Sequence, residues 1–281
     1  MAKHNNTFNT SNTVNTATVS TATLPHILVF DSGAGGLSVA RIVRAKTPCT
    51  LTYIADNKHY PYGEQPSHTL ENIILNTLCP LIQQHQPDLI IIACNTASTL
   101  ILPALRARFN TPIIGVVPAI KPAAKCSNTK TIAVFATKET TQRIYTHNLI
   151  KEHASGVDVI LLSTPILVSA AENYLHGHCP QSAIDHALKT LFNHPKADQI
   201  DTLVLACTHF PLLKQQITHT LQQQQKNIQL LDSGNAIANR AQNLLNIQTA
   251  NTRQGNVNIV LTQNDKQKQH GYKTYLNEIT S

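Results

Sequence analysis

Tryptophan is absent from this chain of 281 residues, methionine occurs once, and aromatic residues make up only 5% of the sequence. Charged residues are also scarce, at 13%, whereas 42% of the residues are hydrophobic. A chain of this length with so many apolar side chains can bury one large core or two modest ones. The composition therefore predicts a soluble globular protein rather than a disordered one.

The six cysteines include no Cys-X-X-Cys pair, and their spacing marks no disulfide framework. We expect them to be reduced and the protein to be cytoplasmic. The one cluster with metal-ligand character is His176, His178 and Cys179, which lacks the second ligand pair that a zinc site needs. The sequence therefore predicts no metal.

The first 24 residues are rich in Thr and Asn and contain neither an apolar run nor an arginine. They resemble neither a signal peptide nor a transit peptide, and we expect no membrane association. Residues 1–24 are predicted to form a disordered or loosely attached extension. The alternative is a regulatory segment that lies on the folded body.

The formal net charge of +7 raises the possibility of nucleic-acid binding. Lys and Arg are nevertheless spread thinly, and no zinc-finger, RNP or helix-turn-helix pattern occurs. The charge therefore favours a basic surface without a specific partner, or one that attracts acidic small molecules, over a nucleic-acid interface.

Two segments repeat one pattern, an apolar run followed by Ala, Cys and hydrogen-bonding residues: DLIIIACNTAS around Cys94 and TLVLACTHFPLL around Cys207. In a parallel sheet, ligands bind at the carboxyl ends of the strands, so each segment offers a thiol to a cleft. A thiol near the amino end of a helix can have its pKa lowered. A single cysteine of this kind is often an inert buried residue, but the repetition favours two halves of an active site, one base and one acid.

Alternating apolar runs and helical patterns predict two similar α/β domains with mainly parallel sheets, related by a pseudo-twofold axis. We place residues 25–117 plus 229–281 in the first domain and residues 118–228 in the second, with the active site in the cleft between them. Expected strands cover residues 26–30, 51–54, 88–93, 113–117, 131–135, 157–162, 202–206, 228–231 and 257–262. Expected helices cover residues 37–44, 69–86, 103–109, 181–192, 211–223 and 236–245, with one more that carries Glu172 and a linking segment from Pro118.

Asp31 and Ser32 end the first strand and precede a glycine-rich turn. A dinucleotide fingerprint counted from Gly33 would need glycine at position 38, which is Ser38. The glycines instead favour close approach of the backbone to a small ligand, with Asp31 facing an amine or the proton of a thiol. The alternative, that Asp31 and Ser32 only cap the next helix, stays open.

Further candidates lie in loops after strands. Tyr62 and Gly63 belong to the loop 57–67, which is either a binding loop or a surface turn. Asn95 and Thr96 follow Cys94, and the Thr-rich turn at Thr137 could bind a carboxylate. His209, two residues beyond Cys207, is a candidate acid or base.

These motifs carry a resemblance to a known family. FDSGAGGLSV (30–39), ADNKHYPYG (55–63), ACNTAS (93–98), GVVPAIKPA (115–123) and ACTHFPLL (206–213) stand in the order found in glutamate racemases. The chain after residue 24 therefore resembles this group of the cofactor-independent aspartate/glutamate racemase family. CTHFPLL favours glutamate over aspartate or hydantoin as the substrate.

The resemblance implies an inversion by two bases without a cofactor, in which Cys94 works on D-glutamate and Cys207 on L-glutamate. It further implies that Asp31 assists Cys94, and that His209, together with Glu172, assists Cys207. The residues implied to hold the substrate are Asp31, Ser32, Tyr62, Gly63, Asn95, Thr96, Thr137, Thr208 and His209. One departure is Thr164, which stands where many members have a cysteine.

The resemblance also implies a supply of D-glutamate for peptidoglycan, a homodimer and, in some members, activation by a peptidoglycan precursor linked to an amino-terminal extension. A racemase of a related amino acid such as aspartate stays an alternative. A basic nucleic-acid-binding or regulatory protein is the alternative from a different class.

Overall fold

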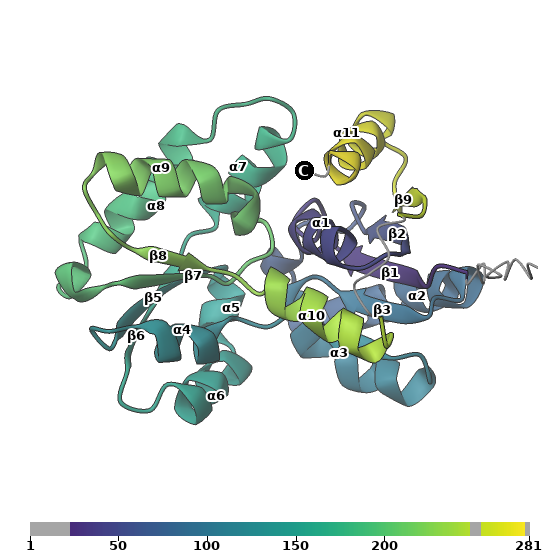
Figure 1. The fold of residues 1–281 in the computed structure, drawn as a ribbon, viewed down its shortest axis with the longest axis horizontal. Coiled ribbons are helices and arrows are strands. Elements are labelled where there is room, and N and C mark those ends of the chain that lie inside the picture. Colours follow the sequence, from purple (N-terminus) through teal and green to yellow (C-terminus); the bar gives the residue numbers. More distant parts are fainter. Residues whose placement is uncertain (1–22, 248–253, 279–281) are drawn as a thin grey trace, which may run out of the picture.

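The computed structural model describes residues 23–247 and 254–278, which form two α/β domains, each built on its own parallel sheet (Figure 1). The predicted fold class is thus confirmed. Of the predicted extension over residues 1–24, residues 1–22 lie outside the described part of the chain.

The first sheet has the strand order β4-β3-β1-β2-β9, and all neighbouring strands are parallel. The strands are β1 (His26–Asp31), β2 (Thr50–Ala55), β3 (Leu89–Ile92), β4 (Ile113–Gly115) and β9 (Val257–Leu261). The connections contain α1 (Leu37–Lys46), α2 (Ser67–His85), α3 (Asn95–Arg108) and a 3-10 turn (Tyr62–Glu64).

The second sheet has the order β6-β5-β7-β8, again with all neighbours parallel. The strands are β5 (Thr131–Ala136), β6 (Asp158–Ser163), β7 (Thr202–Leu205) and β8 (Gln229–Leu231). The helices are α4 (Ile120–Cys126), α5 (Lys138–Gln142), α6 (Ile144–His153), α7 (Ile166–Tyr174), α8 (Gln181–Phe192) and α9 (Lys214–Gln223), with 3-10 turns at Ala197–Gln199 and Phe210–Leu213.

After β8 the chain returns to the first domain. Helix α10 (Gly234–Leu244) packs on α1, β9 joins the edge of the first sheet, and α11 (Lys266–Asn277) packs on β9 and α1 (Figure 1). Because β8 pairs with β7, the crossing back lies after Leu231. The boundary placed before residue 229 was therefore too early.

The strands form because both faces of each sheet are covered, which favours continuous apolar runs. In β1, Ile27 and Val29 face one core cluster, and Leu28 and Phe30 face another on the opposite side. The first of these clusters continues into the second domain through residues such as Phe135 and Leu205. One buried core therefore joins the domains and fixes how the two sheets face each other.

The helices differ from the expectations at several places. Helix α3 begins at Asn95, so Pro103 lies inside it on the exposed face instead of starting it. Part of the expected linking segment is helix α4, and helices α5, α6 and α11 were not predicted. By contrast, α2 matches the prediction although it contains Pro80, which is also exposed.

Within the described residues, no helix combines the length and the apolar character needed to cross a membrane. In the same part of the chain, no three or more His, Cys, Asp and Glu side chains are grouped to hold a metal ion.

Candidate active site

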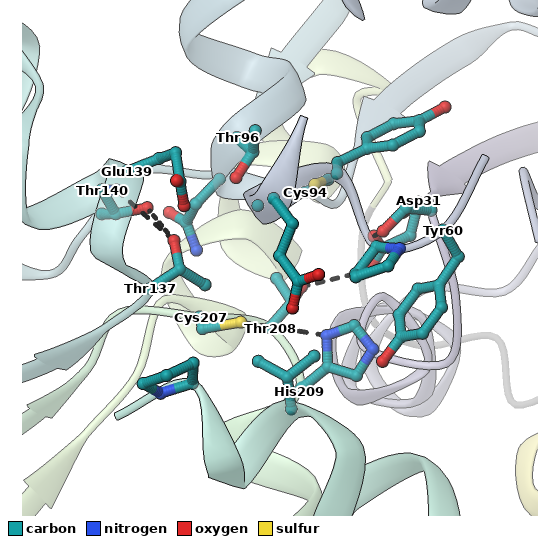
Figure 2. Close-up of a pocket in the computed structure, with 18 of the residues that line it drawn as sticks. Asp31, Tyr60, Cys94, Thr96, Thr137, Glu139, Thr140, Cys207, Thr208 and His209 are labelled. Carbon is teal, nitrogen blue, oxygen red and sulfur yellow. Dashed lines mark hydrogen bonds between the residues drawn. The ribbon is translucent and has the colours of Figure 1, made fainter. Parts of the chain in front are cut away.

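The loops at the carboxyl ends of the strands enclose a cavity of about 220 Å³ (Figure 2). This is smaller than the ~300 to 1,000 Å³ typical of sites for drug-sized ligands, so a small metabolite fits better. All predicted site residues except Glu172 line it: Asp31, Ser32, Tyr62, Gly63, Cys94, Asn95, Thr96, Thr137, Cys207, Thr208 and His209.

Equivalent positions in the two domains deliver the two cysteines. Cys94 follows β3 and is the N-cap residue of α3, whereas Cys207 follows β7 and precedes the 3-10 turn Phe210–Leu213. Cys94 is 6% exposed and Cys207 is 8% exposed, each through the cavity wall. The cavity therefore has one nearly buried thiol from each domain.

The expected lowering of the thiol pKa at a helix start is wrong for Cys94. Burial raises the pKa of Cys94 well above its usual range, and the charge of Asp31 raises it further. The amide of Ala97 in the first turn of α3 acts in the opposite direction but is outweighed. Cys94 is therefore a neutral thiol that can donate a proton.

Asp31 lies beside Cys94 and is completely buried. The hydroxyl of Thr208, from the other domain, donates to its Oδ2 at 3.0 Å, and the amide of Ser32 donates to its Oδ1. Burial raises the pKa of Asp31, although the charge of His209 and these hydrogen bonds oppose the shift. Because the N-cap residue of α1 is Gly36, with no side-chain cap bond, Asp31 and Ser32 do not cap that helix.

Cys207 has a different partner. The Nδ1 atom of His209 lies 3.8 Å from the Cys207 sulfur, and its Nε2 atom lies 2.9 Å from Oε1 of Glu172. Burial lowers the pKa of His209, but hydrogen bonds to Cys207 and Glu172 outweigh this and raise it well above its usual range. The His209 ring is therefore held between Cys207 and Glu172, with its cationic form favoured by these two contacts.

Glu172 lies behind His209 rather than in the cavity wall. Burial raises its pKa, but the hydrogen bond and charge of His209, together with the amide of Ala34 at 2.6 Å, hold the pKa at about 2. Glu172 and His209 thus form a buried ion pair in which the carboxylate fixes the orientation of the ring.

The glycines after β1 are needed for close packing between the domains. A Cβ atom on Gly33 would collide with Glu172 and crowd Tyr60, and one on Gly35 would meet His209 and Thr208 at 2.5 to 2.8 Å. We expected these glycines to admit a ligand to the backbone. Instead, protein side chains fill the space at both positions.

Some predicted binding residues are held by hydrogen bonds within the protein, and one has a polar atom that is unpaired within the described part of the chain. Tyr62 is held by its hydroxyl, which donates to the buried Asp56 at 2.6 Å, and Thr137 caps α5 by accepting from the Thr140 amide. Asn95 keeps a free acceptor, because its Oδ1 is buried and has no hydrogen-bond partner among the described residues. An ammonium group in the cavity could use that oxygen.

Several lining residues were missed by the sequence reasoning: Tyr60, Pro61, Glu64, Lys138, Glu139, Thr140, Pro165 and Val168. Most of them flank Tyr62 or Thr137 in the two loops that had been singled out. The two loops were therefore identified as candidate binding segments, but too few of their residues were named.

Residues 38–241 match the Asp/Glu/Hydantoin racemase family. The chain belongs to this family. The resemblance seen in the sequence motifs is thereby confirmed.

Among its relatives, the chain is 46% identical to the glutamate racemase of Sodalis glossinidius, over 79% of this chain and 76% of that protein. It is 48% identical to the glutamate racemase of Pasteurella multocida, over 79% and 81%. The structure of Escherichia coli glutamate racemase in complex with L-glutamate and the activator UDP-MurNAc-Ala gives a TM-score of 0.81 at 35% identity, covering 91% of this chain and 95% of that one.

Proposed function

We propose that this racemase interconverts L-glutamate and D-glutamate by proton transfer between two cysteines, without a cofactor. The observation that carries the proposal is the convergence of Cys94 and Cys207, at equivalent strand ends of two domains, on one small cavity. The relatives described above are glutamate racemases, which supports glutamate as the substrate.

In the direction from L-glutamate, Cys207 is the base. Its sulfur, with His209 Nδ1 beside it at 3.8 Å, removes the α-proton, and the neutral thiol of Cys94 delivers a proton to the opposite face. One proton leaves the substrate and one enters it, so the products are D-glutamate, a Cys207 thiol and a Cys94 thiolate. The reverse direction starts from this state, with Asp31 available to exchange the proton of Cys94.

The α-proton of an amino acid is much less acidic than a thiol, so the carbanion-like transition state must be stabilised. Hydrogen bonds to the substrate carboxylates in a site shielded from water supply this stabilisation. Asn95, Thr96 and Thr137 line the cavity with donors that carboxylates require, and Tyr62 and Gly63 complete its wall. Ser32 and Thr208 also line it, with their hydroxyls donating to Asp31. Asp31 and the free Oδ1 of Asn95 suit the ammonium group.

The test is incubation of each glutamate enantiomer in heavy water without added cofactor, followed by proton NMR and chiral analysis. We expect both enantiomers to interconvert with deuterium entering at the α-carbon, and both Cys94→Ser and Cys207→Ser to abolish interconversion. Exchange of aspartate but not of glutamate would overturn the substrate assignment. Absence of exchange with both amino acids would overturn the catalytic one.

We further propose that the protein acts in the bacterial cytoplasm, as a homodimer, and supplies D-glutamate for peptidoglycan. The E. coli relative was solved with its activator UDP-MurNAc-Ala, which supports a peptidoglycan precursor as an activator here. Deletion of residues 1–24 should change the kinetic response to UDP-MurNAc-Ala if the extension is regulatory. Analytical ultracentrifugation of the full chain tests the dimer.

A further inference from the structure

Helix α11 comes from the far end of the sequence, beyond the residues that match the family, and lies beside α1 and β9 (Figure 1). Lys268 and Tyr272 stand four positions apart, so they share one face of the helix. The helix packs on β9 and α1, and β9 is hydrogen-bonded to β2. The position of this face relative to the site is therefore fixed by the first sheet.

The hydroxyl of Tyr272 donates to Oε2 of Glu172 at 3.2 Å. The other carboxylate oxygen, Oε1, accepts from the amide of Ala34 and contacts Nε2 of His209. Tyr272 is thus the one hydrogen-bond partner of Oε2 within the described residues. A carboxylate held at both oxygens cannot rotate, whereas one held at a single oxygen can.

Tyr272 is itself locked in place. It is 1% exposed, and its ring meets that of Tyr53 edge-on at a centroid distance of 6.0 Å. Burial and the charge of Glu172 raise the pKa of Tyr272 far above its usual range. The side chain therefore stays a neutral donor whenever the protein is folded.

Lys268 adds a positive charge to the same region. Its Nζ lies 5.8 Å from the centre of the Tyr60 ring, which in turn lies 5.9 Å from the His209 ring. The charge of Lys268 contributes to the low pKa of Glu172. His209 and Lys268 are thus the cations that act on this carboxylate, and Tyr272 supplies the directed hydrogen bond.

We propose that Tyr272 is a positioning residue for the Cys207 half of the site: it holds Glu172 in the orientation that fixes His209 beside the Cys207 sulfur. The proposal rests on the two-cysteine racemisation proposed above. The Cys94 half has no such support, because Asp31 is held by Thr208 and Ser32, with no residue of α11 among its partners.

This asymmetry decides the design of the test. L-glutamate and D-glutamate have equal free energies, so kcat/KM must be equal in the two directions for any variant. A substitution that impairs only the Cys207 step or only the Cys94 step therefore does not make kcat/KM differ between L-glutamate and D-glutamate. Its effect appears in the isotope effects, because the step at Cys207 breaks the C–H bond of L-glutamate and the step at Cys94 breaks that of D-glutamate.

Tyr272→Phe removes the hydroxyl and keeps the packed ring. A hydrogen bond to a charged group is worth enough that we expect kcat/KM to fall about tenfold. The primary deuterium isotope effect on kcat/KM should grow for α-deuterated L-glutamate and shrink for α-deuterated D-glutamate, since the Cys207 step becomes limiting. The matched control is Tyr275→Phe on the same helix, whose ring lies under the Arg41 guanidinium at 4.7 Å and away from this chain of contacts.

A second measurement does not depend on turnover. Mass spectrometry follows the alkylation of Cys207 by iodoacetamide, with the exposed Cys126 as the internal reference. Loss of the Tyr272 hydroxyl should slow alkylation of Cys207 severalfold relative to Cys126, because the His209 ring is no longer held beside the Cys207 sulfur. Tyr275→Phe should leave the ratio unchanged.

The outcomes separate the two proposals. A wild-type protein that fails to racemise glutamate overturns the proposed function, while the alkylation ratio still tests the role of Tyr272. An active wild type with isotope effects and alkylation ratios equal in both tyrosine variants overturns the positioning role alone. A fall in kcat/KM and Tm with unchanged isotope effects and alkylation also overturns it, because that result indicates packing only.

Discussion

The substitution Gly35→Ala tests whether the domains must pack as closely as the structure shows. The added methyl group would meet Nδ1 of His209 at 2.5 Å, Oγ1 of Thr208 at 2.7 Å and Cε1 of His209 at 2.8 Å. Ordinary contacts begin at 3.4 Å. His209 cannot simply rotate away, because Glu172 and Cys207 hold its two ring nitrogens.

The ring must therefore shift by about 1 Å, and a displacement of that size at a reacting group can cost about 100-fold in rate. Overpacking should also lower the free energy of unfolding by about 1 to 3 kcal/mol. Because Thr208 is pushed as well, its hydrogen bond to Asp31 lengthens, so both proton-transfer steps are affected.

The assay is racemisation of L-glutamate followed by chiral chromatography, together with urea unfolding of the same samples. Gly271→Ala in α11 is the matched control, since nothing lies within 4 Å of its added methyl group. Alanine there should leave kcat unchanged and stabilise the helix by up to about 1 kcal/mol. A Gly35→Ala protein with the kcat of the wild type would refute the close packing inferred here.

Two further substitutions test the electrostatics of the site. Glu172→Gln removes the ion pair with His209. The pKa of Glu172 is about 2 in the folded protein instead of 4.5, so its contribution to stability is lost as the pH falls below 4.5. The pKa of His209 is raised above 6.5, so its contribution is lost as the pH rises through the folded value. Between these limits the free energy of unfolding of the wild type should exceed that of the variant by on the order of 3 kcal/mol, and by less on either side. A difference that did not vary with pH in urea titrations would contradict the ion pair between Glu172 and His209. Thr208→Val removes a hydrogen bond that lowers the pKa of Asp31, so the pKa of Asp31 should rise further. The acid limb of the pH profile of kcat/KM should then move to higher pH. An unmoved limb would show that Asp31 does not need to be ionised.

The strands that carry the cysteines were predictable because their signal is strong. Leu89–Ile92 and Thr202–Leu205 are short apolar runs that end in polar turns, and both are buried on two faces. The parallel sheet then requires their carboxyl ends to face ligands. The fold class and the positions of the two thiols could thus be predicted from apolar runs that end in polar turns.

Helix α3 was mispredicted because its first turn serves the site. Asn95, Thr96 and Ser98 are buried there, so polar residues occupy positions that a core helix would fill with apolar ones. The apolar periodicity begins only with Ala97 and Ile101, and Pro103 then looks like a helix start. An exposed proline is tolerated inside the helix because the carbonyl it leaves unpaired can face solvent.

Helix α11 was missed because it buries little. Tyr272 and Leu276 are its buried residues, and the rest of the sequence is polar. Its usable signal was the cap, since the Asp265 side chain accepts from the amide of Lys268 at 3.0 Å. The pKa directions at Cys94 and His209 could not be predicted either, because burial and partners from other elements set them.

The order of the strands has a consequence for how the chain folds as it is synthesised. Strands β5 to β8 are contiguous in the sequence, so the second domain can close as soon as β8 has left the ribosome. The first sheet must wait for β9, which pairs with β2 through contacts such as Leu51 with Val257. Until then β2 is an open edge strand, the kind of surface that pairs with other chains. A nascent chain stopped after β8 would therefore have a complete second sheet without Tyr272 to hold Glu172, and an aggregation-prone first sheet.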